Sequence, residues 1–155
     1  LSLIMQTICS TGIRVSELCF ITAETLASGR TEIRLKGKSR VVLLPRELAQ
    51  RLRQYAQARG IRSGPLFRTR TGMPLDRSNI WREMKTLCRE AGVAPEKVFP
   101  HNLRHLFARS FYEQEKDLAH LADILGHSSI ETTRIYVAVS TQIHEQMLQR
   151  MRLIL

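Results

Sequence analysis

The segment GHSSIETTRIY, residues 126–136, holds a histidine and a tyrosine nine residues apart whose side chains could support a nucleophilic reaction. On a helix, Tyr136 lies about 100° around the axis from Val137, off the apolar line that Val137 shares with Ile130. A phenol is a good nucleophile only when its proton is removed or its anion is stabilised, because its free pKa is about 10. An imidazole such as His127 moves protons near neutral pH. Taken singly, however, His127 is typical of a cap or loop, and Tyr136 of a partly buried aromatic residue.

The segment HNLRHLFARSF, residues 101–111, places His101, Arg104 and His105 on one predicted helix. His101 and Arg104 are three residues apart and are therefore neighbours, a pattern that also occurs on solvated helix faces. His105, four residues after His101, raises the alternative of a metal pair. Zinc catalysis needs a third ligand and usually a nearby carboxylate, and this helix offers neither. We therefore expect His105 to be structural, and we disfavour a zinc hydrolase built on His101, His105 and His127.

Two further segments carry basic side chains next to glycine breaks. In TGIRVSEL, residues 11–18, Arg14 precedes Glu17 by three residues, which fits either a plain helical ion pair or an arginine held by a carboxylate and aimed at an anion. In the predicted hairpin, Lys36 lies beside Gly37 and Lys38. Such a basic turn commonly contacts phosphate backbones, but a turn tip can also deliver one proton-donating ammonium group, and we favour Lys36 for that role.

Together these side chains suit the cleavage of a phosphodiester without a metal ion. A phenol supplies the nucleophile, and two guanidinium groups hold the non-bridging oxygens as charge builds on phosphorus. Imidazoles transfer protons or donate to the phosphate, and a lysine protonates the leaving alkoxide. The candidate catalytic residues are Arg14, Lys36, His101, Arg104, His127 and Tyr136.

The elements that must position these residues are mostly helical. Alternating β-branched residues at 31–45 predict two strands with a turn near Gly37. Helices are expected at 1–10, 15–21, 45–60, from Asp76 or Ser78 to 92, in the segment after 100, and at 117–125, 128–136 and 140–153. Ser128 and Glu131 fit a capping box for the helix that carries Tyr136. The prediction is a single, mainly helical α+β domain with a short antiparallel β-hairpin.

Size and charge limit the class of partner. The 155 residues are enough for one domain, and 43% are hydrophobic. The 24 basic and 14 acidic residues give a net charge of +10, which favours a polyanion such as nucleic acid. Three cysteines without a CxxC pair favour a reducing, cytoplasmic compartment. There is no apolar run of membrane-spanning length and no signal peptide. Since the chain opens within a helical pattern and without an initiator Met, we expect it to be a fragment that lacks a preceding domain.

The order of these motifs resembles the catalytic domain of the tyrosine recombinase or phage-type integrase family. The similarity covers about residues 1–150 and is carried by TGIRVSEL, the hairpin lysine, HNLRHLFA and LADILGHSSIETTRIY. It implies the fold of that domain, an N-terminal DNA-binding domain absent from this fragment, and a site-specific DNA recombinase or integrase of mobile-element or phage type. Double-stranded DNA is the implied partner, and the full-length protein would act as a homo-tetramer on two DNA sites. No cofactor, metal ion or small-molecule substrate is implied.

The resemblance also implies a role for each matching position. Tyr136 would attack a DNA phosphate and form a 3′-phosphotyrosyl link, which frees a 5′-hydroxyl. Arg14 and Arg104 would hold that phosphate, with His127 donating to it, and Glu17 would support the basic cluster.

Proton transfer falls to the two remaining candidates. His101 would assist at the tyrosine, and Lys36 would act as the acid toward the departing 5′-oxygen.

Two alternatives for the chemistry stay open from the sequence. A type IB topoisomerase-like nicking-closing enzyme would use the same groups on one duplex, and a DNA-binding domain could keep the fold with an inert site. A helix from Ser128 to Tyr136 would rise about 12 Å. Tyr136 and His127 could therefore reach the same phosphate only if the helix that carries Tyr136 leans or shifts. We therefore expect a mobile Tyr136 segment that points away without DNA. The last helix either covers the domain's own core or docks on a neighbouring protomer.

Overall fold

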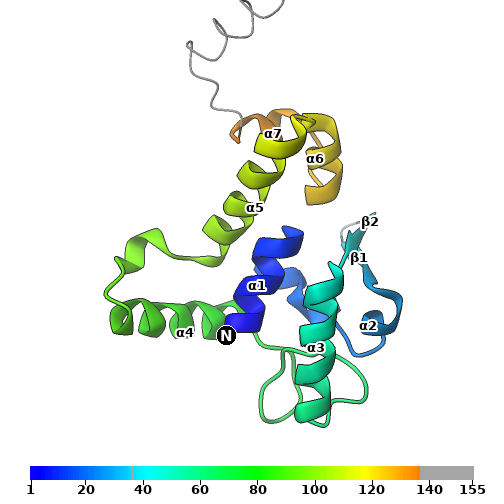
Figure 1. Ribbon diagram of the computed structural model, residues 1–155, viewed down its shortest axis with the longest axis vertical. Coiled ribbons are helices and arrows are strands. Elements are labelled where there is room, and N and C mark those ends of the chain that lie inside the picture. Colours follow the sequence, from blue (N-terminus) through cyan, green and yellow to red (C-terminus); the bar gives the residue numbers. More distant parts are fainter. Residues whose placement is uncertain (36, 137–155) are drawn as a thin grey trace, which may run out of the picture.

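A computed structural model describes residues 1–35 and 37–136 (Figure 1). Position 36 and residues 137–155 lie outside the described residues, and so do the predictions made for Lys36 and for the last helix. In chain order the elements are α1 (Ser2–Thr11), the 3₁₀ helix η1 (Val15–Phe20), α2 (Thr25–Ser28), β1 (Arg30–Leu35), β2 (Lys38–Leu43), α3 (Arg46–Ala58), α4 (Arg77–Glu90), the 3₁₀ helix η2 (Pro95–Lys97), α5 (Pro100–Glu115), α6 (Leu118–Leu125) and α7 (Glu131–Arg134). The mainly helical α+β prediction is confirmed.

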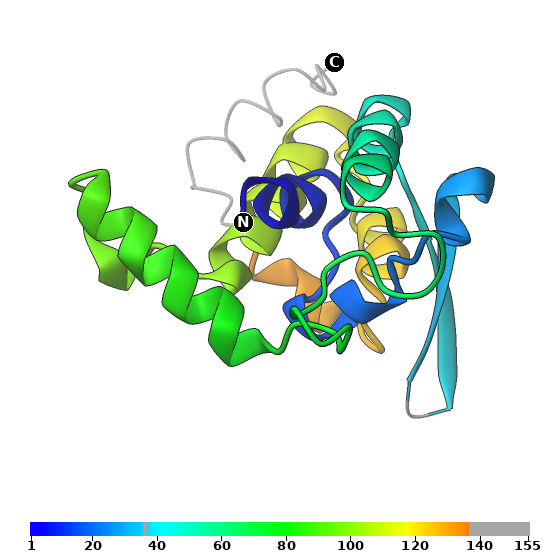
Figure 2. The same ribbon diagram turned by 90° about the horizontal axis from the view of Figure 1, so that it is seen from below.

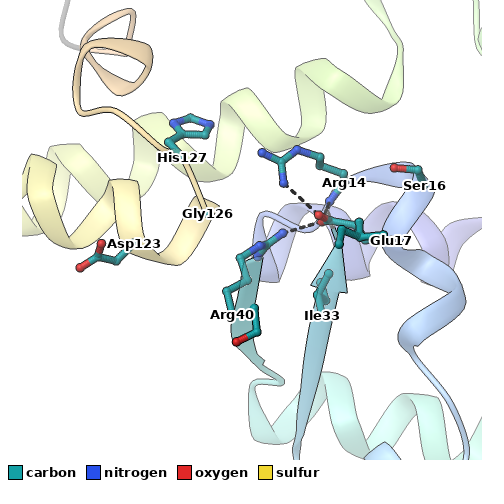
Figure 3. Close-up of a pocket in the computed structure, with 10 residues that line it drawn as sticks. Arg14, Ser16, Glu17, Ile33, Arg40, Asp123, Gly126 and His127 are labelled. Atoms are coloured by element: carbon teal, nitrogen blue, oxygen red, sulfur yellow. Dashed lines mark hydrogen bonds and ion pairs between the residues drawn. The ribbon is translucent and has the colours of Figure 1, made fainter. Parts of the chain in front are cut away.

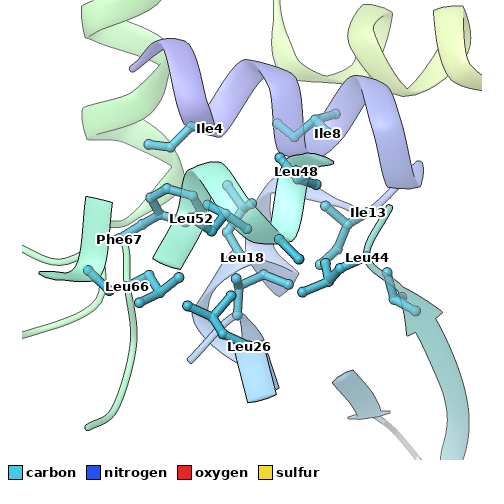
Figure 4. Packing of buried hydrophobic residues seen from close by; sticks show 14 of the residues in the cluster. Ile4, Ile8, Ile13, Leu18, Leu26, Leu44, Leu48, Leu52, Leu66 and Phe67 are labelled. Atoms are coloured by element: carbon cyan, nitrogen blue, oxygen red, sulfur yellow. The ribbon is translucent and has the colours of Figure 1, made fainter. Parts of the chain in front are cut away.

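The larger hydrophobic core lies between α1, α3, η1 and the hairpin (Figure 4). Helix α1 buries Ile4 and Ile8, one turn apart, and ends where Gly12 adopts a left-handed conformation with φ of 64°. Helix α3 begins after Pro45, whose fixed φ suits a helix start, and it buries Leu48 and Leu52 against the same core.

The hairpin pairs β1 with β2 in antiparallel register. Ile33 lies opposite Arg40, and directly paired residues project to the same face of a sheet. Ile33 and Val42 are both buried, so that face is the inner one. Because Arg40 is two residues from Val42, it also faces inward.

Helices α5 to α7 form a second layer around a smaller core (Figures 1 and 2). Helix α5 lies against α1, and the starts of α4 and α5 border a common hollow. Asp76 caps α4 by accepting a hydrogen bond from the Asn79 N–H at 2.8 Å, so the capping alternative Ser78 was wrong. None of the helices in the described ranges is long and apolar enough to cross a membrane.

Two sequence predictions fail in this layer. The spacing of Leu103, Leu106, Phe107 and Phe111 predicts that they share the apolar side of the helix after residue 100, but Leu106 is 55% exposed, whereas Arg104 and Ala108 are buried. The continuous helix expected from Ser128 to Tyr136 is only the one-turn helix α7, and the Glu131 N–H is bonded by Ser129 rather than Ser128. Polar contacts account for both differences. Arg104 faces inward because its guanidinium binds two buried carbonyls, and the chain before Tyr136 turns toward His127, which contacts Thr133.

Candidate active site

Arg104 is the buried centre of the site, with 2% of its surface exposed. Its Nη1 donates to the Gly12 carbonyl and its Nη2 to the Leu125 carbonyl at 2.7 Å. Gly12 and Leu125 are at the C-terminal ends of α1 and α6, where carbonyls lack helical partners, so both helix ends gain a donor. Nη2 also lies 3.2 Å from His127 Nε2. Burial lowers the pKa of Arg104 to about 10, and nearby arginines add to that shift, yet the group stays charged at neutral pH.

His127 lies in the corner between α6 and α7, after Gly126 ends α6 with φ of 65°. A guanidinium only donates, so the contact with Arg104 makes His127 Nε2 an acceptor. The ring proton then resides on Nδ1, which donates to Thr133 Oγ1 at 2.8 Å. Burial, followed by the positive charge of Arg104, lowers the pKa of His127 to about 4. The ring is therefore neutral at pH 7 in this state.

Tyr136 lies against this corner and not away from it. Only 8% of the residue is exposed, and its ring packs on the smaller core. The rings of Tyr136 and His127 are stacked, with centroids 6.4 Å apart and an interplanar angle of 14°. Because α7 is a single turn and Thr133 is bonded to His127, no leaning of a long helix is needed to bring the two rings together. The expectation that Tyr136 points away is thus wrong for this structure.

The two histidines of α5 extend the site along the helix. His105 meets the Tyr136 ring edge-on, with centroids 4.9 Å apart, and meets His101 at 4.2 Å. Burial lowers the pKa of His105, and the charge of His101 adds to this. His101 itself is exposed, and it borders a separate hollow of about 600 Å³ between the starts of α4 and α5. His105 thus contacts both the proposed nucleophile and the proposed proton acceptor.

Arg14 is held by the buried side chain of Glu17, of which 1% is exposed. The Arg14 Nη1 lies 2.9 Å from Glu17 Oε1, and the Arg14 N–H donates to Oε2 at 2.8 Å. Glu17 therefore satisfies the backbone N–H of the residue that precedes η1, as the acidic member of a capping box does. Glu17 Oε2 also accepts from Arg40 Nη2 at 2.5 Å, so one carboxylate joins two arginines.

Arg14, Glu17, Arg40 and His127 line a hollow of about 950 Å³ (Figure 3). Arg14 and His127 point toward one another across it, and Arg40 of β2 contacts Glu17 of η1 at its edge. The structure therefore brings together Arg14, Arg104, His127 and Tyr136, with His101 at one side through His105. Residues 1–35 and 37–136 contain no group of three or more His, Cys, Asp or Glu side chains that could hold a metal ion.

Two residues of the site were not among the sequence candidates. Arg40 could have been found from strand parity, because it shares a face with buried Val42. No sequence signal identifies Thr133, since its contact with His127 depends on how the chain turns after α6.

Comparison with known proteins identifies the family. Residues 1–142 match the phage integrase family. The chain is 35% identical to tyrosine recombinase XerA of Thermococcus kodakarensis over 147 residues, covering 90% of this chain and 51% of that protein. It is 36% identical to tyrosine recombinase XerC of Pseudomonas entomophila over 146 residues, covering 90% and 48%. The chain thus spans about half the length of the curated relatives it matches.

Solved structures agree with this similarity. The crystal structure of XerA recombinase superposes with a TM-score of 0.75 at 30% identity, covering 99% of this chain and 58% of that one. XerH site-specific recombinase bound to difH substrate, in a pre-cleavage complex, superposes with a TM-score of 0.79 at 28% identity, covering 97% and 46%. The resemblance inferred from the sequence motifs is confirmed, and the chain belongs to the phage integrase family.

Proposed function

We propose that this chain is the catalytic part of a site-specific DNA recombinase or integrase of mobile-element or phage type. The observation that carries the proposal is the stacking of the Tyr136 phenol on His127, which in turn contacts Arg104 beside the hollow that Arg14 lines. A nucleophile, a proton-carrying ring and two guanidinium groups thus converge on one place. The named function of relatives at 35% identity and the substrate-bound XerH structure support the same conclusion.

In the proposed reaction, the Tyr136 oxygen attacks phosphorus while the bond from phosphorus to the 5′-oxygen breaks. Arg14 and Arg104 hold the non-bridging oxygens, where negative charge grows in the transition state. A bound phosphate replaces the Arg104–His127 contact, and its negative charge raises the pKa of His127, so that Nε2 can carry a proton and donate it. The product is a 3′-phosphotyrosyl link.

Two protons move in this step. His101 takes the phenolic proton, and Lys36 supplies a proton to the departing 5′-oxygen. Charge and atoms balance without a cofactor or ATP, and the phosphotyrosyl link conserves the energy of the broken ester. A 5′-hydroxyl from a second DNA site then attacks that link, which releases Tyr136 and joins the strands. We propose a homo-tetramer on two duplexes for this exchange, in the cytoplasm where the DNA lies.

Covalent capture of DNA tests this proposal. The probe is a pool of duplexes with randomised centres and a nick, so that a short strand beyond the cleavage site diffuses away and the adduct persists. We expect the chain to form denaturation-resistant adducts whose sequences converge over rounds of selection. Tyr136→Phe should retain DNA affinity and form no adduct, because it lacks only the nucleophilic oxygen.

Three other outcomes would contradict the proposal. Adducts of undiminished yield with Tyr136→Phe would show that another residue is the nucleophile. Relaxation of supercoiled plasmid without strand exchange between two selected sites would favour a nicking-closing enzyme, and absence of any adduct would favour an inert DNA-binding domain.

A further inference from the structure

Arg40 is a nearly buried arginine at the edge of the hollow, with 11% of its side chain exposed. Its Nη2 donates to Glu17 Oε2, and its Nη1 donates to the Ile124 carbonyl at 2.9 Å. Burial lowers the pKa of Arg40, and the negative charge of Glu17 offsets part of that shift. Burial of a charged group costs desolvation free energy even when the group is paired. An arginine at this position therefore needs an explanation.

The two contacts of Arg40 join segments that are far apart in the sequence. Through Glu17 it reaches Arg14 on the η1 side, and through Ile124 it reaches the end of α6, two residues before Gly126. A Cβ atom added to Gly126 would overlap the Arg40 side chain, so the corner that carries His127 packs directly on it. The hairpin thus links the two groups that face each other across the hollow.

Direct binding of phosphate by Arg40 is the competing explanation, because this residue also lines the hollow. Its contacts argue against that role. Arg40 is held by the Glu17 carboxylate and the Ile124 carbonyl, and among the described residues it lacks a contact such as that of Arg104 with His127, which a phosphate is proposed to replace. Arg14 leaves 41% of its side chain exposed and Arg40 leaves 11%, so Arg14 is the more accessible of the two arginines that line the hollow, and Arg40 is placed to hold it through Glu17.

We propose that Arg40 is a positioning residue, which fixes the separation between Arg14 and His127 so that both reach one phosphate. This inference rests on the proposed function. A guanidinium is required because its planar fork reaches two acceptors in a fixed geometry, which a lysine ammonium does not reproduce. Displacement of a catalytic group by about 1 Å costs on the order of 100-fold in rate.

Arg40→Lys is the first variant, because it keeps the positive charge beside Glu17 and removes the fork. We expect adduct formation on a selected duplex to slow about 10- to 100-fold at saturating DNA, with DNA affinity within about 3-fold of the parent. Arg34→Gln is the matched control on the same hairpin. Arg34 is 77% exposed and pairs only with Glu32 among the contacts of the described residues, so its cleavage rate should not change.

A substrate with sulfur in place of the bridging 5′-oxygen distinguishes a defect at the leaving group from a defect at the non-bridging oxygens. A thiolate leaves without a proton, since thiols have a pKa of about 8.5. The defect of Lys36→Ala should therefore disappear on this substrate. The defect of Arg40→Lys should persist, because Arg14 and His127 act on the non-bridging oxygens. Full rescue of Arg40→Lys would overturn the proposal and would place Arg40 on the leaving-group side.

Gly126→Ala gives a second variant that leaves Arg40 intact but pushes it aside. Gly29→Ala is its control, since Gly29 has a similar φ of 66° but no atom within 4 Å of an added Cβ. Amide hydrogen exchange can be measured without any DNA cleavage. Faster exchange at positions 126 and 127 in Arg40→Lys and Gly126→Ala, and not in Gly29→Ala, supports the proposal. Unchanged exchange at these two positions in the first two variants refutes it. If the parent chain forms no adduct while exchange responds as expected, the proposed function fails and the positioning contact stands.

Discussion

At the scale of single residues, the site satisfies its charges with one another. Arg104 donates to three acceptors, which are two backbone carbonyls and the His127 ring. His127 in turn donates a hydrogen bond to Thr133. An arginine this buried would be unfavourable without such partners. Arg104 therefore has a structural role in addition to the catalytic role that we propose for it.

Arg104→Ala should accordingly damage both properties. Loss of the donors leaves two buried carbonyls without them, which costs about 2–4 kcal/mol of unfolding free energy. Loss of charge at the phosphate costs on the order of 100- to 1,000-fold in the rate of adduct formation. Arg14→Ala should lose a similar factor in rate with a smaller loss of stability, because Arg14 is half-exposed and Arg40 remains beside Glu17. Urea unfolding and single-turnover capture measure the two effects, and equal rates for Arg14→Ala and the parent would contradict the clamp.

The pH dependence of stability should report His127. Its pKa is about 4 in the folded chain and about 6.5 when unfolded, so between these values the unfolded state binds more protons. Its contribution to stability is complete above about pH 6.5 and is lost as the pH falls toward 4. Thermal unfolding should therefore show a smaller fall in Tm across that window for His127→Gln than for the parent. A direct measurement is the ring titration by NMR, and a midpoint near 6.5 would contradict this burial.

At the scale of elements, helix ends place the site. Arg104 is held by the last carbonyls of α1 and α6, and His127 follows the glycine that ends α6. Gly12 has φ of 64°, and a Cβ there would overlap the Phe107 ring. The end of α1 thus approaches α5 closely because Gly12 has no side chain.

Gly12→Ala should therefore move the carbonyl that holds Arg104. Gly60→Ala is the control, since Gly60 has φ of 63° and nothing within 4 Å of an added Cβ. We expect the control to lose about 1 kcal/mol of stability from backbone strain alone. Gly12→Ala should lose about 1–3 kcal/mol more through overpacking and should slow adduct formation. Equal values for the two variants in denaturant unfolding and capture assays would contradict the contact.

Sequence patterns predicted these elements unevenly. Alternation gave both strands, and glycines marked the ends of α1 and α6, because these are local properties of the chain. The inward orientation of Arg104 was missed, since an arginine is normally assigned to the surface unless its distant carbonyl partners are known. The short α7 was missed for the same reason: Thr133 contacts His127 only after the chain has turned.

At the scale of the whole molecule, net charge sets the expected salt dependence of the proposed DNA binding. The net charge is +10, and the hollow is lined by Arg14 and Arg40. Affinity for a selected duplex should fall steeply as salt rises, with log K changing by about −0.9 per log unit of salt for every phosphate neutralised. Fluorescence anisotropy over a salt series measures the slope. Replacing one exposed Lys or Arg that contacts a phosphate by a neutral residue should reduce the magnitude of this slope by about one. An affinity that does not change with salt would contradict binding to the phosphate backbone.

Thr133 joins the proposed nucleophile to its neighbouring histidine. Its hydroxyl accepts a hydrogen bond from His127, and its carbonyl accepts the Tyr136 N–H at 3.1 Å. In the assembly of several copies that we propose, a rotation of residues 131–136 that withdraws Tyr136 in one subunit would therefore also remove the support of its His127. One movement would then disable two proposed catalytic groups of an idle subunit together.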